Sequence, residues 1–216
     1  MILLDEVNAN WRKVAVVREK YLMLIEAKDC RDKSFLKKIP SDKPGWYKWY
    51  ATIEGIKILL NSSYIKGEFF SDILPLLTKI EFNEKIYYCI YVGQAVKGSI
   101  QARLDWHINQ KHTKAAVESG FLSTFRKTIS SLVAGDQTNE QVTNNFIDTL
   151  LVDYNAENYA IKSDEARRKI DGIENMEMND NVLPLNIKGN KHKEVADFIK
   201  ELKQARKNSK KIEIKR

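Results

Sequence analysis

The sequence predicts an α/β domain: a small central mixed sheet of about three strands, flanked by helices, with a helical N-terminal extension and a basic C-terminal helix. Runs rich in aromatic and β-branched residues occupy positions 46–52, 86–92 and 146–154, and such runs are typical of buried strands. Other stretches repeat apolar residues every three or four positions, which indicates amphipathic helices. The chain has 216 residues, 43% of them hydrophobic, so it can bury one core with elaborations.

The N-terminal extension is expected to be a helix over residues 4–27, followed by a polar connection over 28–43. Apolar residues recur there at near-helical spacing with charges between them, at Leu4, Val7, Trp11, Val14, Tyr21 and Leu24. The expected organisation is an extension over residues 1–43, a central domain over 44–190 with an insert at 52–85, and a basic C-terminal helix and tail over 191–216.

The first strand of the central domain is expected at 46–52. Pro44 has no amide hydrogen, so it can start a strand but cannot lie inside one. Alternation along the strand then places Tyr47, Trp49 and Ala51 on one face and their neighbours on the other. If Tyr47 points into a cleft, the other two residues share that face.

A second strand, a turn and a helix follow. The strand covers residues 86–92, and Gly93 is expected to end it. Ser99 is placed to cap a helix. Arg103 and His107 lie four positions apart on that helix, so they share one edge of it. The apolar residues of the helix recur every fourth position, at Ile100, Leu104 and Ile108.

A second helix, over residues 122–132, is expected to end at Gly135. Exposed amides and cations near its start are suited to binding phosphate, and a capped surface helix is the alternative for each of these residues: Ser123, Thr124, Arg126 and Lys127. The expected elements after it are a polar loop over 136–145, a strand over 146–154, a helix over 162–178 and a basic helix over 193–207.

The strand, turn and helix bring Tyr91, Arg103 and His107 together, and this pattern resembles the GIY-YIG nuclease superfamily. The family's two tyrosine motifs are similar to Gly45-Trp46-Tyr47 and Tyr91-Val92-Gly93. Its arginine, with a histidine one helical turn later, looks like Arg103 and His107. A glutamate on a later helix and an asparagine twelve positions on are similar to Glu174 and Asn186. The resemblance covers residues 44–190.

The insert at 52–85 is one departure from the family pattern, because it separates the two tyrosine motifs. Residues 56–60 fit either a helix or a strand, and residues 69–77 fit a helix kinked at Pro75. The insert is either a loop that reads DNA or padding over the core.

The residues after Glu174 are a second departure. Asn175-Met176-Glu177-Met178 stands where the family has an aliphatic pair. Glu165 and Glu177 therefore remain alternatives to Glu174.

The resemblance implies an enzyme that hydrolyses phosphodiester bonds in double-stranded DNA with Mg²⁺ or Mn²⁺. Carboxylate oxygen suits such hard cations, so Glu174 is the expected metal ligand. Tyr47 is the expected general base, which neighbouring positive charge must activate because a free tyrosine has a pKa of about 10. Arg103 offers its planar guanidinium to the phosphate. Supporting roles fall to Tyr91 and His107, through hydrogen bonds or proton relay, and to Asn186, which braces the site.

The positive charge is concentrated at the C-terminus. Residues 188–216 contain eleven Lys or Arg and four Asp or Glu, which accounts for the whole net charge of +7. Such a segment commonly neutralises nucleic-acid phosphates, and a solvated terminal helix is the alternative. The expected nucleic-acid contacts are Arg126, Lys127, Lys188, Lys191, Lys210 and Lys211.

The composition also argues against a membrane protein, a secreted protein and a zinc-binding protein. No run approaches the ~18 apolar residues of a membrane span. No basic region followed by an apolar one opens the chain, so a signal peptide is not expected. Cys30 and Cys89 lack a paired spacing, which argues against a structural zinc site. A cytoplasmic protein fits these features, and the oligomeric state is open, with a homodimer as one arrangement.

The leading hypothesis is thus a metal-dependent DNA endonuclease that resembles the restriction-type members of the family, as a compact chain with no separate DNA-binding module. One alternative is a non-catalytic nucleic-acid-binding protein on the same scaffold. A small structural or partner-binding protein, in which the motifs are coincidental, is the other.

Overall fold

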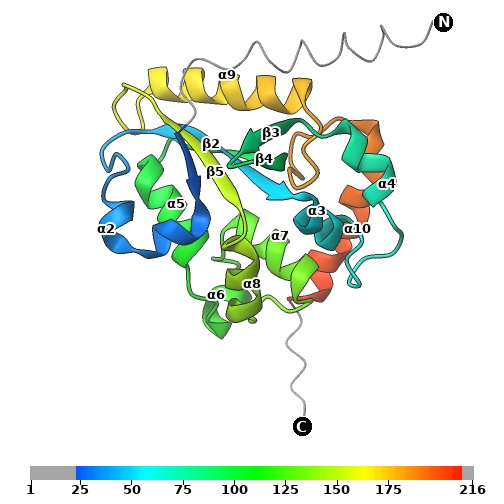
Figure 1. Cartoon of the computed structure of the whole chain (residues 1–216). Helices are drawn as coiled ribbons and strands as arrows, with labels where there is room; N and C mark the ends of the chain where they lie inside the picture. Colours follow the sequence, from blue (N-terminus) through cyan, green and yellow to red (C-terminus); the bar gives the residue numbers. More distant parts are fainter. Residues whose placement is uncertain (1–22, 211–216) are drawn as a thin grey trace, which may run out of the picture.

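The computed structural model describes residues 23–210, in which one antiparallel sheet carries helices on both faces (Figure 1). The strand order is β1-β5-β2-β4-β3. The strands are β1 (Met23–Glu26), β2 (Gly45–Thr52), β3 (Lys79–Phe82), β4 (Lys85–Ala95) and β5 (Leu151–Ala156). The central position of β2, between β5 and β4, places the first tyrosine motif in the middle of the sheet.

The predicted α/β class, with a central sheet flanked by helices, is confirmed, but the described sheet has five strands rather than about three. Every pairing is antiparallel, so the sheet is not mixed. The two additional strands, β1 and β3, have four residues each and lie at the edges. Such short strands show too little alternation to be recognised from sequence. A two-residue turn at Asn83 and Glu84, both with positive φ, joins β3 to β4 as a hairpin.

The helices of the described residues surround this sheet. They are η1 (Ala27–Arg31), α2 (Lys33–Leu36), α3 (Ile53–Leu60), α4 (Phe70–Ile73), η2 (Leu74–Leu76), α5 (Ile100–Asn109), α6 (Lys114–Glu118), α7 (Thr124–Val133), α8 (Glu140–Ile147), α9 (Asp164–Asp180), η3 (Lys193–Val195) and α10 (Ala196–Asn208). None of them is long and apolar enough to cross a membrane.

Several helix predictions are confirmed. Ser99 caps α5, because its side chain accepts a hydrogen bond from the amide of Ala102. Residues 56–60 of the insert, which fitted either a helix or a strand, are helical. Within the helix predicted over 69–77, the geometry changes from α to 3₁₀ at Leu74, one residue before Pro75. Helices α7, α9 and α10 also lie where helices were predicted.

Other boundaries were wrong. The strand predicted over 146–154 begins only at Leu151, because Phe146 and Ile147 form the end of α8. Helix α8 occupies part of the predicted polar loop, where the Asn139 side chain caps it. Gly93 does not end β4, which continues to Ala95.

The predicted N-terminal helix over 4–27 lies largely outside the described residues. Its last part is not helical, since Met23–Glu26 forms β1 and pairs with β5.

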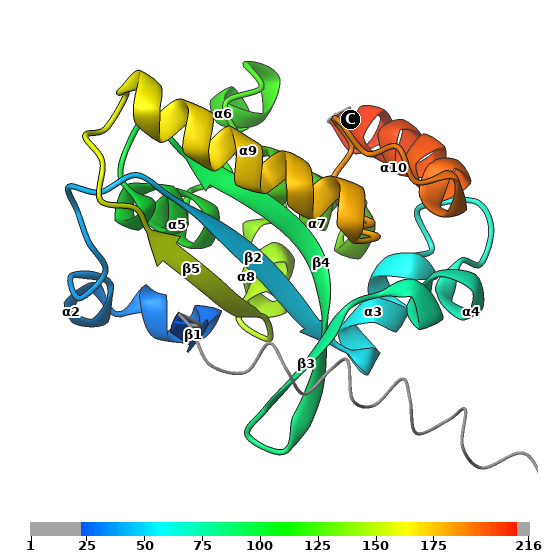
Figure 2. The same cartoon turned by 90° about the horizontal axis from the view of Figure 1, so that it is seen from above.

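The two faces of β2 follow the predicted alternation. Tyr47, Trp49 and Ala51 join the main core on the face covered by α3, α5 and α7. On the other face, Trp46 packs with residues of α9, and Lys48 forms an ion pair with that helix. Figure 2 shows α9 lying over β2 and β4.

Candidate active site

A cleft of about 410 Å³ lies where the C-terminal half of β4 meets α5, α9 and the start of α7. Five of the six predicted catalytic residues line it, and they come from four elements: Tyr47, Tyr91, Arg103, His107 and Glu174. The cleft thus gathers side chains from sequence positions as far apart as 47 and 174.

The shortest contact between these residues joins Tyr47 to His107. The Tyr47 hydroxyl lies 2.6 Å from Nε2 of His107, and each residue is only 2% exposed. The His107 ring is enclosed by the rings of Trp49, Trp106 and Phe125. An apolar cage of this kind fixes the imidazole in one orientation against the tyrosine.

Gly93 explains how Tyr47 reaches this position. The two residues face each other directly across β2 and β4. A Cβ on Gly93 would lie 2.5 Å from Cζ of Tyr47, so any other residue would displace the phenol ring. Gly45, at the start of β2, is required for the same reason, because a Cβ there would overlap the carbonyl oxygen of Asn155.

Burial shifts the pKa values of the hydrogen-bonded pair in opposite directions. It raises the pKa of Tyr47 well above its usual value, with a further increase from Tyr91, and Arg103 opposes this only in part. Burial, Arg103 and Arg126 together hold the pKa of His107 well below its usual value. Both groups are therefore neutral near pH 7. In the tautomer protonated on Nδ1, the Nε2 atom of His107 accepts the hydrogen bond and is the nearest acceptor for the phenol proton.

Arg103 and Tyr91 form the more accessible part of the cleft. The Arg103 guanidinium lies over the ring of Trp106, 4.9 Å from its centroid. Among the described residues it forms no ion pair, so its donors remain available to an anion. Burial raises the pKa of Tyr91 to about 12, with Glu174 adding to the increase.

Of the three candidate glutamates, only Glu174 lines the cleft. Gln94 donates a hydrogen bond of 2.6 Å to Oε2 of Glu174 and fixes the carboxylate. Burial raises the pKa of Glu174. Glu165 is solvent-exposed near Arg168, whereas Glu177 pairs with Lys48 at 2.5 Å. The geometry favours Glu174 as the functional carboxylate.

Asn186 does not line the cleft but holds β4 from behind it. Its side chain accepts from the Val92 amide and donates to the Val92 carbonyl, both at 2.9 Å. The amide of Leu185 donates to the carbonyl of Ile90, 3.1 Å away. β3 pairs only with the first half of β4, so these bonds replace strand pairing beside Tyr91. This position fits the predicted bracing role.

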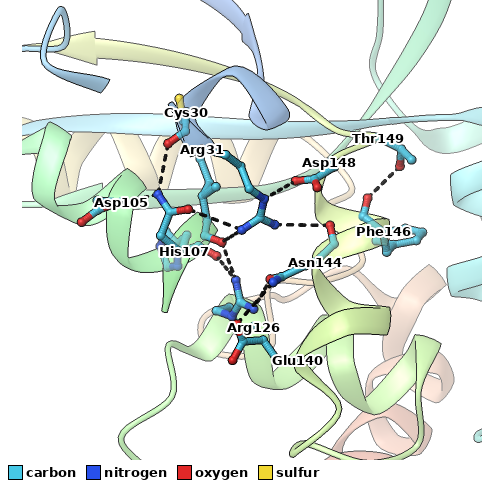
Figure 3. A network of polar contacts seen from close by, with 12 residues as sticks. Cys30, Arg31, Asp105, His107, Arg126, Glu140, Asn144, Phe146, Asp148 and Thr149 are labelled. Carbon is cyan, nitrogen blue, oxygen red and sulfur yellow. Dashed lines mark hydrogen bonds and ion pairs between the residues drawn. The ribbon is translucent and has the colours of Figure 1, made fainter. Parts of the chain in front are cut away.

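The prediction that Arg126 contacts nucleic acid is wrong. Its side chain is fully buried, and Figure 3 shows it at the centre of a polar network. It donates to the backbone carbonyls of His107 and Ile108 at 3.0 and 2.8 Å, and to the Asn144 side chain at 2.6 Å. A guanidinium with its donors used in this way cannot reach a phosphate, and it instead pairs the last carbonyls of α5.

A second arginine and a histidine complete this network. Arg31 donates to the same Ile108 carbonyl and pairs with Asp148 at 2.8 Å (Figure 3). His112 accepts from Nε of Arg126 at 2.6 Å, and its Nδ1 lies 2.7 Å from the carbonyl of Gln137. Burial and the adjacent Arg126 lower the pKa of His112 to about 4, which fits a neutral ring. The network anchors the end of α5 that carries His107.

The lysines that were predicted to contact nucleic acid lie in different parts of the structure. Lys127 lines the cleft, and its ammonium donates to the carbonyl of Gly120. Lys188, Lys191 and Lys210 are exposed, and Lys188 lies close enough to Glu174 to oppose the increase in the pKa of Glu174. Lys211 lies outside the described residues.

Sequence reasoning missed five residues that line the cleft: Gln94, Trp106, Gly120, Phe121 and Leu122. Gln94 and Trp106 each adjoin a predicted residue in the sequence, Gly93 and His107, and that adjacency was the available signal. Phe121 gave no signal, because a 68% exposed phenylalanine in a loop is recognised only once the loop is placed.

The residues present allow one kind of metal site. The described part of the chain holds no group of three or more His, Cys, Asp or Glu side chains arranged to enclose a metal ion. Mg²⁺, however, is usually bound through one or two carboxylates together with substrate phosphates and water. A single carboxylate at Glu174, open to the cleft, fits a site that substrate completes.

A comparison with protein families agrees with this geometry. The model of the GIY-YIG catalytic domain matches residues 45–208, from the start of β2 to the end of α10. No curated protein and no solved structure matches the chain. The matched range covers more than half of the chain and includes every residue assigned to the cleft.

Proposed function

Because the chain belongs to the GIY-YIG nuclease superfamily, we propose that it is a metal-dependent endonuclease that hydrolyses phosphodiester bonds in double-stranded DNA. The observation that carries the proposal is the 2.6 Å contact between the Tyr47 hydroxyl and His107, in one cleft with Arg103 and Glu174. A proton acceptor, a cation for the phosphate and a carboxylate for a metal ion thus converge on one space. These are the groups that phosphodiester hydrolysis requires.

In the proposed reaction, a water molecule attacks the phosphorus atom, and one P–O bond forms as the bond to the leaving oxygen breaks. The water loses a proton to the Tyr47 hydroxyl oxygen, while the phenol proton moves to Nε2 of His107. This transfer leaves Tyr47 uncharged, which its raised pKa favours, and it starts from a neutral His107. The burial and the two arginines that lower the pKa of His107 also destabilise the imidazolium that forms.

Arg103 stabilises the phosphate as negative charge accumulates on it, because its guanidinium has no ion-pair partner in the described part of the chain. Glu174 would hold Mg²⁺ or Mn²⁺, with Gln94 orienting the carboxylate. When bound, such an ion supplies positive charge to the phosphate and to the departing oxygen.

The direct test is cleavage of a supercoiled plasmid with Mg²⁺, with and without a chelator. Native protein should cut only with the metal, and Glu174→Gln should lose at least about 10²-fold in single-turnover rate while still binding DNA. Glu165→Gln is the matched control, because Glu165 is on the same helix but exposed outside the cleft. Normal cutting by Glu174→Gln with loss in Glu177→Gln would show that the wrong carboxylate was chosen. DNA binding without any metal-dependent cutting would favour the non-catalytic alternative.

A restriction-type role is the finer proposal, and it predicts cutting at a short recognition sequence. Sequencing the ends of a fully digested plasmid tests it directly. Ends distributed at random would contradict the restriction role but not the nuclease chemistry.

A further inference from the structure

A second hollow, here called the basic groove, continues from the cleft toward the C-terminal helix. It has a volume of about 280 Å³ and shares Gly120 and Lys127 with the cleft. Its charged lining consists of Lys127, Lys203, Arg206, Lys207 and Lys210, and no acidic residue lines it. The two hollows therefore form a path from Tyr91 and Arg103 to a strongly cationic surface.

Four of these cations form a stripe on α10 and just beyond its end. Lys203, Arg206, Lys207 and Lys210 stand at positions i, i+3, i+4 and i+7, so they share one face. At 1.5 Å per residue the stripe is about 10 Å long. The opposite face of α10 is buried in the core through Phe198, Ile199, Leu202 and Ala205.

Hydrogen bonds fix this stripe against the elements around the cleft. The Ser209 hydroxyl contacts that of Ser131 on α7 at 2.7 Å. The side chain of Gln137 donates a hydrogen bond to the Arg206 carbonyl at 2.8 Å, and the backbone amide of Gln137 donates one to the Ser209 carbonyl at 3.1 Å. Figure 1 shows α10 beside α7. The groove is therefore a fixed surface rather than a flexible tail.

The positive charge of the groove is not neutralised within the described residues. Arg206 is half-buried, yet it forms no ion pair there, and burial lowers its pKa. Burial lowers the pKa of Lys127 as well, and Arg206 and Lys210 add to the decrease by repulsion. Partly buried cations that repel one another raise the free energy of the fold unless an anion is bound. Arg206 also lies close enough to Tyr91 to oppose the increase in the pKa of Tyr91, which places Arg206 between the groove and the cleft.

We propose that the basic groove binds the phosphate backbone of the DNA beside the phosphate that is cut, with Arg206 nearest the cleft and the three lysines farther along. A stripe of about 10 Å spans about three phosphates of one strand, which are spaced ~3.4 Å apart along the duplex axis. The inference rests on the proposed nuclease function, since it supplies the contacts that hold the substrate in register with Tyr47 and Arg103. It assigns DNA binding to a folded surface of α10, in addition to the exposed lysines at 188 and 191.

The test measures binding of a fluorescent DNA duplex by anisotropy over a range of salt concentrations, without divalent metal and in the Glu174→Gln background to prevent cutting. The groove variant is Lys203→Gln/Lys207→Gln/Lys210→Gln. The matched control, Lys37→Gln/Lys57→Gln/Lys85→Gln, removes the same charge from exposed lysines that line neither hollow. Arg206→Gln and Arg206→Lys separate charge from packing at the position nearest the cleft.

The groove variant should lower the salt slope by up to about 2.7, or 0.9 for each phosphate that is no longer neutralised, and weaken binding at least about tenfold at low salt. The control should change the slope by less than about 0.9. Arg206→Lys should retain most of the affinity that Arg206→Gln loses. Equal slopes for groove and control variants, in a protein whose native form cuts DNA, would overturn the groove assignment. A selective decrease in slope in a protein whose native form never cuts would support the groove and refute the proposed nuclease function.

Discussion

Replacing Tyr47 by phenylalanine removes one oxygen atom and tests the centre of the proposed mechanism. That oxygen lies 2.6 Å from His107 in a cleft where no other described side chain makes a hydrogen bond to this imidazole. Loss of a general base typically lowers the rate by ~10²–10⁴, which corresponds to about 3–5 kcal/mol of activation free energy. We expect Tyr47→Phe to fall within this range in single-turnover cleavage of a plasmid at fixed magnesium concentration.

The same substitution has a calculable effect on stability, which must be separated from the effect on rate. It leaves Nε2 of the buried His107 without a partner, which costs about 1–3 kcal/mol of unfolding free energy. For a domain of this size that lowers Tm by ~2–12 °C. Rates measured at 25 °C on folded protein exclude this contribution.

Tyr154→Phe is the matched control for this experiment. Tyr154 is buried next to Tyr47 on the adjacent strand and on the same face, but it does not line the cleft. It should retain a rate within about threefold of the native protein, because its hydroxyl lies outside the cleft and takes no part in the proposed proton transfer. A Tyr47→Phe variant that cuts as fast as Tyr154→Phe would refute the assignment of Tyr47 as proton acceptor.

The remaining predictions use the same cleavage and melting assays. Gly93→Ala should reduce the rate by at least about 10²-fold, because its methyl group displaces the Tyr47 ring; a normal rate would show that the ring has room to move. Arg126→Met should lower unfolding free energy by about 3–5 kcal/mol, since it leaves buried acceptors unpaired, whereas DNA affinity of the folded protein should hardly change. Weaker DNA affinity with normal melting would instead favour a phosphate-binding role. His112 has a pKa of about 4 in the folded protein and about 6.5 in the unfolded chain, so protonation favours the unfolded chain. The free energy of unfolding should therefore decrease as pH falls from about 6.5 toward about 4. NMR of the imidazole nitrogens should find His107 and His112 neutral at pH 5.5, and titration of either ring near 6.5 would contradict the buried network.

The parts of the site that the sequence determined are those set by local periodicity. Alternation along a strand fixes which face Tyr47 occupies, and the 3.6-residue period of a helix places Arg103 and His107 on one edge. The serine cap of α5 is likewise a contact over three residues, between Ser99 and Ala102. Such relations depend on backbone geometry alone, so they can be inferred before the fold is known.

Contacts between distant segments decided the rest. The sequence did not show that Asn186 would complete the edge of β4, 94 positions away, because that edge exists only once β3 has ended. It favoured Glu174 but could not exclude Glu165 or Glu177, whereas the structure places Glu174 in the cleft and pairs Glu177 with Lys48. The short edge strands β1 and β3 could not be predicted from the sequence either, because each depends on pairing with a strand that the folded sheet places beside it.

Arg126 and Lys127 show most directly what the sequence alone could not determine. They are adjacent in sequence and chemically similar, so both were expected to bind phosphate. A helix turns about 100° between neighbouring residues. The Arg126 side chain is therefore buried against the end of α5 and against α8, while that of Lys127 lies at the cleft. Whether a cation binds DNA or supports the core therefore depends on which helix face the tertiary structure covers, and composition and charge do not carry that information.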